Sequence, residues 1–468
     1  MPNNGKTNLP APQKGYSFGT MPVFLAAIST ILGAIMFLRF GYAVGHVGLV
    51  GAISIVILGH MVTIPTALAI AEISTNRKVE GGGEYFIISR SFGTTIGSVI
   101  GLSLYFSQAI SVAFYMIAFA EAFRPFELYV QKWIGIAFDP RMISIPGTLL
   151  LVVLILAKGA NMGISMLYVV VATLATSLFA FFLGSPVPGF DPLAVSLTAS
   201  TANAHPFFLV FSICFPAFTG MTAGVGLSGD LANPRRSIPL GTLSATLVGM
   251  VVYIAIVTKL AYSAPPDVLA RDQLVMAKVS IWGPIILVGL GCATLSSAIG
   301  SILVGPRTLQ ALGADRSLPW DRFSKWIAVG HGPKNEPRRA TLVTSAFALV
   351  VVFLGNVDFV ARLISMFFMV TYGSLCAISF LEHFAARPSY RPSFRSRWYV
   401  SLFGAAVCFF MMFQMDPLYA FSAVIVLASV YVLIARQNKD DLHGLAAMFE
   451  GVFTQATRYL QIQLQRRR

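Results

Sequence analysis

Apolar runs of about 20 residues recur along most of this chain, and each run is long enough to cross a lipid bilayer as a helix. Hydrophobic residues make up 56% of the 468 residues, whereas charged residues make up only 11%. In hydrocarbon, a helix satisfies its backbone hydrogen bonds internally. The sequence therefore predicts an all-α membrane protein with about twelve transmembrane helices.

The predicted spans divide the chain into three parts. We expect a cytoplasmic N-terminal tail over residues 1–20, a transmembrane transporter domain over 21–435, and a cytoplasmic amphipathic helix over 436–468. The first part is polar and lacks the apolar core of a signal peptide. In the last part Leu445, Phe449, Val452, Phe453, Ala456 and Leu460 recur at helical spacing, which predicts a helix that lies on the membrane or against a second subunit. A frayed tail is the alternative.

The basic residues are placed in a way that indicates a membrane protein and not a nucleic-acid-binding one. The formal net charge is +14, but the basic residues collect in alternate loops between the apolar runs. This is the positive-inside pattern. It predicts a multi-pass protein of the cell (inner) membrane with both termini in the cytoplasm, and no nucleic-acid partner. The four cysteines all lie in apolar runs and are interpreted as small core residues.

Two of the apolar runs are interrupted by glycine or proline. The first run has Gly33 at its middle, and the run that starts at Phe207 contains Pro216 and Gly220. Unpaired backbone at membrane depth is tolerated only where protein or a watery cavity covers it. The carbonyls freed at the end of a first half can hold a cation, and the amides freed at the start of a second half can hold an anion. A plain kinked helix is the alternative interpretation.

The two interrupted runs each open one half of the first ten predicted helices. Five helices per half is an odd number, so the two halves have opposite orientations in the membrane. This is the inverted-repeat arrangement of secondary transporters, whose substrate site lies where the two broken helices meet. The sequence thus predicts a 5+5 inverted repeat with two extra helices, in which helices 1 and 6 are broken.

No arrangement of residues indicates an enzyme or a bound cofactor. The triple glycine at 81–83 lacks the following Lys-Ser/Thr and the preceding strand of a phosphate loop. The carboxylates Glu72, Asp230, Asp358 and Glu382 all fall near predicted helix ends, so a cation at mid-depth must use neutral oxygens. The desolvation cost of such a cation favours an anion bound nearby, which indicates transport of a monovalent salt.

Arg39 and Glu121 are the intramembrane charges that could pair. Both lie towards the outer ends of their predicted helices. We expect an extracellular gate that closes through this pair, with a purely structural salt bridge as the alternative.

Several stretches resemble the cation–chloride cotransporter family, part of the amino acid–polyamine–organocation superfamily. They are GAIMFLRFGYAVGHVGL, ISTNRKVEGGGEYFIISRSFG, FPAFTGMTAGVGLSGDLANPRRSIPLGTL, ATLSSAIGSILVGPRTLQAL, NEPRRA and RPSYRPSF. The resemblance spans nearly all of the membrane region. It implies the LeuT-like fold with two extra helices, and a homodimer in the lipid bilayer.

The resemblance also implies three kinds of ion site. The potassium site of the family falls on Thr30, Ile31, Tyr115, Pro216 and Thr219. The chloride sites fall on Gly33, Ala34 and Ile35 and on Gly220, Met221, Thr222 and Tyr372. The sodium site falls on Ser29, Leu32, Ala293, Ser296 and Ser297. The presence of Tyr115 together with both serines favours a sodium–potassium–chloride type.

The resulting hypothesis is secondary active symport of chloride with potassium and sodium, near electroneutrality and by alternating access. An amino acid or polyamine permease of the same superfamily is the first alternative. Such carriers need small residues along the break in helix 1, whereas Ala34, Ile35 and Met36 crowd that space here. The second alternative is a membrane scaffold that transports nothing, against which the intact set of expected ion ligands argues.

Overall fold

The computed structural model of the chain describes residues 19–76, 85–86, 88–89, 93–158, 164–193, 195–225, 231–318, 320–332, 335–385, 390–437, 453–454, 457–458, 461–462 and 464–465. The predicted N-terminal tail lies outside this part except for its last two residues. The predicted C-terminal amphipathic helix also lies outside it, except for Arg436, Gln437 and four pairs of residues. The predictions for these two segments therefore stay predictions.

Regular structure in the described residues is helical, apart from the bridge residue Leu231 and an isolated β-bridge between His331 and Glu336. The helices of the first half of the chain are α1 Thr20–Ile31, α2 Ala34–Leu38, α3 Phe40–Asn76, α5 Thr94–Glu121, η1 Arg124–Phe126, α6 Glu127–Ile134, α7 Arg141–Lys158 and α8 Ile164–Phe182. Those of the second half are α9 Phe207–Cys214, η2 Phe215–Phe218, α10 Met221–Val225, α11 Pro234–Ala261, α12 Pro266–Arg271, α13 Val275–Val279, α14 Gly283–Ala314, α15 Asp321–Ala328, α16 Arg338–Leu354, α17 Val357–Ala385, α18 Trp398–Met415 and α19 Pro417–Gln437.

Nine helical segments among the described residues are long and apolar enough to cross a membrane. Two shorter apolar helices, Arg141–Ala157 and Met166–Phe182, accompany them. The chain is therefore an integral, multi-pass membrane protein, as its sequence predicts. The expected number of about twelve spans stays a prediction.

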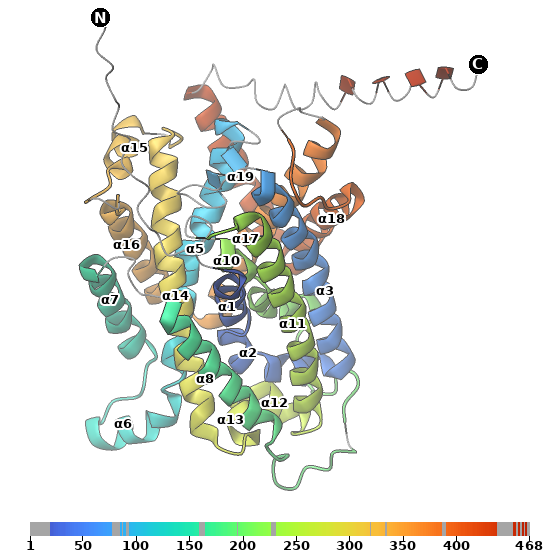
Figure 1. The fold of residues 1–468 in the computed structure, drawn as a ribbon. Coiled ribbons are helices and arrows are strands. Elements are labelled where there is room, and N and C mark those ends of the chain that lie inside the picture. Colours follow the sequence, from blue (N-terminus) through green and yellow to red (C-terminus); the bar gives the residue numbers. More distant parts are fainter. Residues whose placement is uncertain are drawn as a thin grey trace, which may run out of the picture.

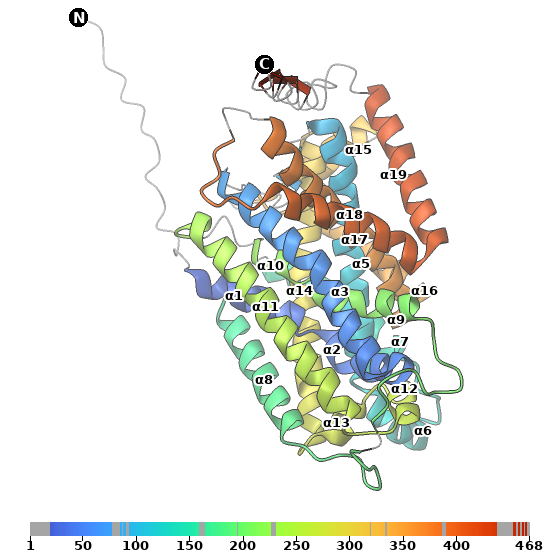
Figure 2. The same cartoon turned by 90° about the vertical axis from the view of Figure 1, so that its right-hand side faces the viewer.

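The spanning helices differ sharply in burial, and this difference separates an inner core from an outer wall. In α5, 89% of the most apolar 18-residue window is buried, whereas in α19 the figure is 11%. The apolar side chains of Phe421 and Ile425 on α19 are exposed. A helix that is apolar all round and unburied by its own chain faces lipid. We therefore place α19 at the lipid-facing rim, where Figure 2 shows it beside the rest of the bundle.

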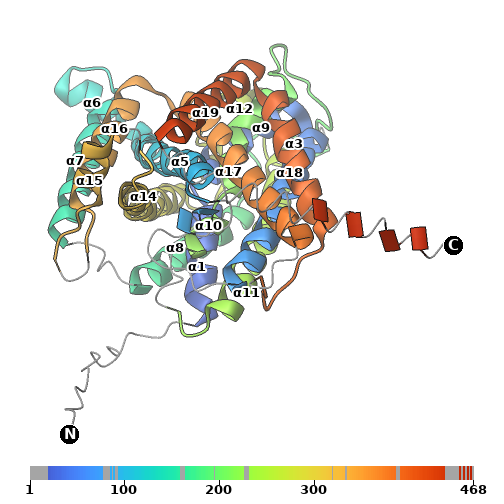
Figure 3. The same ribbon diagram turned by 90° about the horizontal axis from the view of Figure 1, so that it is seen from above.

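The short helices α1, α2 and α10 occupy the middle of the bundle (Figure 1). Seen along the bundle, α1 and α10 lie among α3, α5, α11, α14 and α17 (Figure 3). The core side chains of α1 and α2, such as Ile31 and Phe37, are almost completely buried. The polar backbone at the ends of these short helices is thus surrounded by protein and not by lipid. Non-helical backbone within a membrane requires such cover.

The two ends of the bundle differ in charge. The end where α11 and α16 begin and α14 finishes carries Arg235, Arg236, Arg307, Arg338 and Arg339. At the opposite end lie α6, α12 and α13, at the bottom of Figure 1. The basic end is the one that the positive-inside pattern assigns to the cytoplasm.

Candidate functional site

The first interruption lies between α1 and α2. Helix α1 ends at Ile31, and α2 begins at Ala34. Between them Leu32 (φ −80°, ψ 46°) and Gly33 (φ −92°, ψ −152°) lie outside helical geometry. The last carbonyls of α1 and the first amides of α2 therefore lack the partners that a continuous helix would provide.

The second interruption lies between α9 and α10. Helix α9 tightens into the 3₁₀ turn η2, which contains Pro216, and α10 begins only at Met221. Proline has no amide hydrogen and cannot continue the α-helical hydrogen bonding. Thr219 and Gly220 make the connection, and the Thr219 amide donates to the Pro216 carbonyl (3.3 Å).

The two interruptions touch each other at Gly220. A Cβ atom on Gly220 would lie 2.5 Å from the Ile31 amide nitrogen and 2.8 Å from the Thr30 carbonyl carbon. Both separations are too short for a side chain, so only glycine allows the backbones of the two interruptions to approach this closely. The freed backbone groups of both interruptions are thereby brought into one place.

A cavity of about 80 Å³ opens beside this contact. Its 13 lining residues come from α1, α5, α10, α14, α17 and the second interruption: Thr30, Leu104, Gln108, Ser111, Tyr115, Thr219, Thr222, Ala223, Ser297, Gly300, Ser301, Val304 and Phe368. None of these 13 carries a formal charge. Any ion held by them would therefore have to rely on hydroxyl, amide and carbonyl groups.

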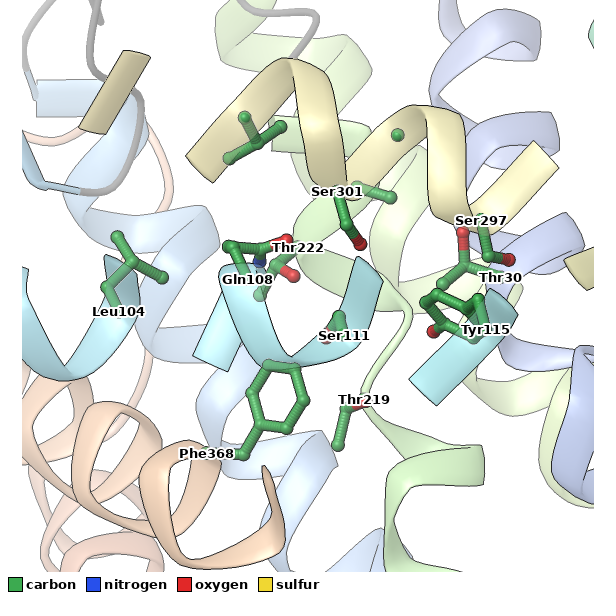
Figure 4. Close-up of a pocket in the computed structure, with 13 residues that line it drawn as sticks. Thr30, Leu104, Gln108, Ser111, Tyr115, Thr219, Thr222, Ser297, Ser301 and Phe368 are labelled. Carbon is green, nitrogen blue, oxygen red and sulfur yellow. The ribbon is translucent and has the colours of Figure 1, made fainter. Parts of the chain in front are cut away.

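Five of the expected site residues line the cavity together. They are Thr30, Tyr115, Thr219, Thr222 and Ser297. Figure 4 shows Thr30, Tyr115 and Ser297 turned towards one another from α1, α5 and α14. The structure thus brings together side chains that lie nearly 270 positions apart in the chain.

The Ser297 hydroxyl is a buried polar group of this cluster. The Ser297 side chain is buried, and its Oγ has no hydrogen-bond partner of acceptable geometry among the described residues, although the Tyr115 side chain is close to it. Ser297 Oγ also lies about 4.0 Å from where a Gly33 Cβ would stand. A buried hydroxyl without a partner is costly, so a free oxygen at this position fits a bound ligand.

The hydroxyls of Thr30 and Thr219 are turned back to their own chain. Thr30 Oγ1 donates to the Ala26 carbonyl (3.0 Å), and Thr219 Oγ1 donates to the Pro216 carbonyl (2.8 Å). Ser29 Oγ also donates to Ala26 (3.1 Å). A hydroxyl whose hydrogen is engaged in this way still has oxygen lone pairs. Thr30 and Thr219 can therefore present oxygen to a cation in the cavity.

Two buried tyrosines donate to the carbonyls at the interruptions. The Tyr253 hydroxyl of α11 donates to the Ile31 carbonyl (2.5 Å), and the Tyr372 hydroxyl of α17 donates to the Thr219 carbonyl (2.7 Å). Tyr372 is one of the expected chloride residues. The sequence reasoning missed Tyr253, although a tyrosine in the middle of the apolar run of α11 is a signal that could have drawn attention to it.

The remaining expected ion residues are not part of the cavity lining. They are Ser29, Ile31, Leu32, Gly33, Ala34, Ile35, Pro216, Gly220, Met221, Ala293, Ser296 and Tyr372. All are buried except Ser296, which is half-buried. Most of them belong to the two interruptions, where the expected contacts are made by backbone amides and carbonyls.

The two residues of the expected gate have different partners in this structure. Arg39 Nε donates to Asp358 Oδ1 at the start of α17 (2.6 Å), and Glu121 pairs with Arg124 three residues further along the chain. The expected Arg39–Glu121 pair is therefore not the one formed here. Sequence reasoning treated Asp358 only as an acid near a helix end, because the fold alone brings it to Arg39.

No group of three or more histidines, cysteines or carboxylates that could hold a metal ion occurs in the part of the chain that the structure describes. Buried carboxylates do occur, but outside the cavity lining. Glu72, near the C-terminal end of α3, accepts hydrogen bonds from Tyr390 (3.1 Å) and from Ser396. The polar chemistry of the cavity is therefore that of neutral oxygens.

Comparison with known proteins identifies the family. The model of the amino acid permease family matches residues 22–468. Solute carrier family 12 member 2 of Squalus acanthias is 30% identical over 94% of this chain and 40% of its own length. The Danio rerio member 2 is 31% identical (89% and 41%), and the Mus musculus member 1 is 30% identical (89% and 43%).

The chain spans about two fifths of the length of these curated relatives. The match to the amino acid permease family model includes the interrupted helices and the cavity residues. Proteins of this kind are transporters and not enzymes. The chain therefore belongs to the amino acid permease family, and it is similar to members of solute carrier family 12.

Proposed function

We propose that this protein is a secondary active symporter that moves chloride together with potassium and sodium, near electroneutrality and by alternating access. The observation that carries the proposal is the uncharged cavity at the contact between two interrupted helices. Such helices direct carbonyl ends at cations and amide ends at anions. The pocket can then bind ions of both signs without a side chain of formal charge.

The cations would be held by neutral oxygens. Potassium would contact Tyr115 and the backbone or hydroxyl oxygens of Thr30, Ile31, Pro216 and Thr219. Sodium would be bound between α1 and α14, at Ser29, Leu32, Ala293, Ser296 and Ser297. The Ser297 oxygen, which has no hydrogen-bond partner among the described residues, supports the second assignment. Each cation loses water on entering, and only part of that cost is offset by neutral ligands.

The anions would be held by backbone amides. One chloride would lie at Gly33, Ala34 and Ile35, where α2 begins, and the other at Gly220, Met221, Thr222 and Tyr372. Ions of opposite sign that lie several ångströms apart in a buried site attract each other by a few kcal/mol. This attraction couples cation binding to chloride binding and favours transport of neutral combinations of ions.

In this conformation we infer that the cavity faces the cytoplasm. Its lining continues along α5 and α14 to Leu104 and Val304, towards the basic end of the bundle. Among the described residues, no atom lies within 4 Å of where a Cβ on Gly300 would stand, so the described part of the chain does not fill this side. Towards the other end, the buried rings of Phe40 and Tyr253 stack with centroids 4.5 Å apart.

Alternating access would exchange this closed outer side for an open one. The Arg39–Asp358 pair lies on the closed side, where breaking it would accompany opening. Glu121 could then become a partner of Arg39, which keeps the expected gate as a hypothesis. The two sets of five helices would form an inverted repeat within a total of about twelve, with both termini in the cytoplasm, and the protein would form a homodimer in the cell (inner) membrane.

The proposal is tested by uptake of radioactive rubidium, as a potassium substitute, into proteoliposomes that contain the purified chain. Uptake should require external chloride, should fall when gluconate replaces chloride, and should fall when N-methylglucamine replaces sodium. Protein-free liposomes give the background. Rubidium uptake that is indifferent to chloride would reject chloride-coupled transport.

An amino acid or polyamine permease is the second candidate, and the match to the amino acid permease family model favours it. Two features oppose it. The cavity of about 80 Å³ is far smaller than the roughly 300–1,000 Å³ of pockets for organic ligands. Ala34, Ile35 and Met36 are also buried directly after Gly33, where a substrate carboxylate would have to lie. Thermal stabilisation of the purified protein by an amino acid, with none by chloride salts, would reverse the choice.

A further inference from the structure

One hydroxyl group lies between the two helix interruptions. Tyr253 is completely buried in α11, and its Oη donates to the Ile31 carbonyl at 2.5 Å. The same oxygen lies 3.5 Å from the Ala217 carbonyl in the 3₁₀ turn of the second interruption. A hydroxyl has one hydrogen to donate, so the short contact to Ile31 is the main bond and the contact to Ala217 is secondary.

The position of this hydroxyl is set by tight packing on both faces of the ring. Tyr253 stacks on Phe40, with centroids 4.5 Å apart and planes inclined by 24°, and meets the Phe218 ring edge-on at 5.3 Å. One helical turn earlier, a Cβ on Gly249 would lie 2.6 Å from Ile31 Cγ2. Helix α11 therefore contacts Ile31 through both its carbonyl and its side chain, and the Tyr253 ring cannot swing away without disturbing the stack.

This contact decides how the Ile31 carbonyl is directed. A carbonyl oxygen has two lone pairs, and the Tyr253 hydroxyl uses one of them. The other remains free, and its direction is fixed by the bond to Tyr253. Ile31 is one of the residues whose oxygen is expected to bind the transported cation, and the neighbouring Thr30 lines the cavity. Orientation of ligand oxygens before an ion arrives lowers the cost of binding it.

We propose that Tyr253 is a positioning residue that orients the Ile31 carbonyl and thereby sets the affinity for the transported cation. This inference rests on the proposed function. Tyr253 does not contact the ion in this arrangement, because its oxygen is already directed at the two carbonyls. Its effect is selective, since the amides expected to bind chloride after Gly33 and Gly220 receive no hydrogen bond from the Tyr253 hydroxyl, which is a donor.

The test is the variant Tyr253→Phe of the full chain in proteoliposomes, with rubidium uptake measured as a function of rubidium and of chloride concentration. Phenylalanine preserves the ring stack and removes only the hydroxyl. The KM for rubidium should rise about tenfold, as the loss of one buried hydrogen bond predicts. The KM for chloride should stay within about twofold of the wild-type value.

Tyr105→Phe is the matched control. Tyr105 is also buried, its oxygen accepts a bond from Thr344 Oγ1 (3.5 Å), and it does not line the cavity. This variant should leave both KM values within about twofold of the wild type. If Tyr253→Phe raises the two KM values equally, or lowers only the maximal rate, the residue is merely structural and the inference is overturned.

A second measurement is used if the Tyr253→Phe variant reaches the membrane but takes up too little rubidium for KM values to be determined. The melting temperature of the purified protein is measured in rubidium chloride, in choline chloride and in choline gluconate, so that the effects of rubidium and of chloride are separated. In Tyr253→Phe the extra stabilisation by rubidium should disappear, whereas the stabilisation by chloride should persist. Retention of the rubidium effect overturns the inference. A wild-type protein without chloride-dependent rubidium uptake rejects the proposed function itself, and this inference with it.

Discussion

Both helix interruptions free backbone groups beside the cavity, but the backbone departs from α-helical geometry in a different way at each. Between α1 and α2 the change is abrupt, with two non-helical residues between Ile31 and Ala34. Between α9 and α10 it is gradual, because the chain passes through the 3₁₀ turn Phe215–Phe218 first. In the second case Thr219 bonds locally to the Pro216 carbonyl through both its amide and its hydroxyl. In the first case the Ile31 carbonyl depends on a donor from another helix, Tyr253.

This difference indicates that the surrounding fold controls the interruption between α1 and α2 more than the one between α9 and α10. A segment whose backbone groups form hydrogen bonds within the segment keeps its conformation when its neighbours move. A segment whose carbonyl is bonded to a donor on another helix changes its conformation when that donor moves. Both interruptions nevertheless receive a tyrosine hydroxyl on a freed carbonyl, from Tyr253 and from Tyr372. The following predictions test how far the two interruptions are equivalent.

The largest effect is expected at the contact between the interruptions. In Gly220→Ala the new methyl group would lie 2.5 Å from the Ile31 nitrogen, so the two backbones must separate. Overpacking of this kind costs about 1–3 kcal/mol of stability, and rubidium uptake should fall by at least about tenfold. Uptake and melting temperature are the measurements. Gly291→Ala is the control, because its Cβ would meet only Phe119, at an ordinary 3.7 Å. Equal activity of both variants would show that the two interruptions do not need to touch.

The next effect is expected at Tyr115 of α5, which lines the cavity together with Thr30 and Thr219. Tyr115→Phe removes an oxygen expected to bind potassium and leaves the backbone amides in place. The KM for rubidium should rise about tenfold and the KM for chloride should change little. Concentration series of each ion in proteoliposomes measure the two values. Identical kinetics in variant and wild type would exclude Tyr115 as a cation ligand.

At Tyr372 we expect a smaller effect, in which the KM for chloride changes more than the KM for rubidium. The Thr219 carbonyl that accepts its bond shares a peptide group with the Gly220 amide, one of the expected chloride contacts. Tyr372→Phe should therefore misdirect that amide and raise the KM for chloride about fivefold. The KM for rubidium should rise less, because the Thr219 hydroxyl that is left to contact potassium is bonded to Pro216 and not to Tyr372. The comparison with Tyr253→Phe is the control. If both variants impair the same ion, the two tyrosines have the same role, and the expected division between a cation effect at Tyr253 and a chloride effect at Tyr372 is wrong.

The smallest effect on stability is expected at Ser297, whose hydroxyl has no hydrogen-bond partner of acceptable geometry in the part of the chain that the structure describes. In sodium-free buffer, Ser297→Ala should leave the free energy of unfolding unchanged or raise it by up to about 1 kcal/mol. Stabilisation by added sodium should disappear. Thr294→Ala in the same helix is the control, since Thr294 Oγ1 donates to the Leu290 carbonyl (2.8 Å) and its removal should be destabilising. Sodium-dependent melting that survives in Ser297→Ala would exclude Ser297 from a sodium site.

Much of the architecture follows from local pattern. The apolar runs predict the membrane-spanning helices, because length and hydropathy alone decide whether a helix can lie in a bilayer. Gly33, Pro216 and Gly220 mark where helical hydrogen bonding is weakest. Glycine is conformationally free and proline lacks an amide hydrogen, and both properties belong to the single residue. The resemblance of short motifs to a known family also pointed to Thr30, Tyr115, Thr219, Thr222 and Ser297, which line one cavity.

The missed features depend on contacts between distant parts of the chain. Arg39 pairs with Asp358, 319 residues away, and not with Glu121, which has Arg124 within reach on its own segment. Tyr253 lies 222 residues from the carbonyl to which it donates. Gln108 and Ser301 line the cavity, although no local pattern distinguishes them from other polar residues in apolar helices.

The sequence by itself determined that this protein is a helical membrane protein with two apolar runs interrupted at glycine or proline, because hydropathy and backbone freedom are properties of single residues and short segments. Only the tertiary structure decided that Gly220 contacts the Thr30–Ile31 backbone and that a tyrosine from another helix donates to one carbonyl at each interruption. The physical reason is that hydrogen-bond geometry and close packing depend on positions in space, which no local pattern encodes.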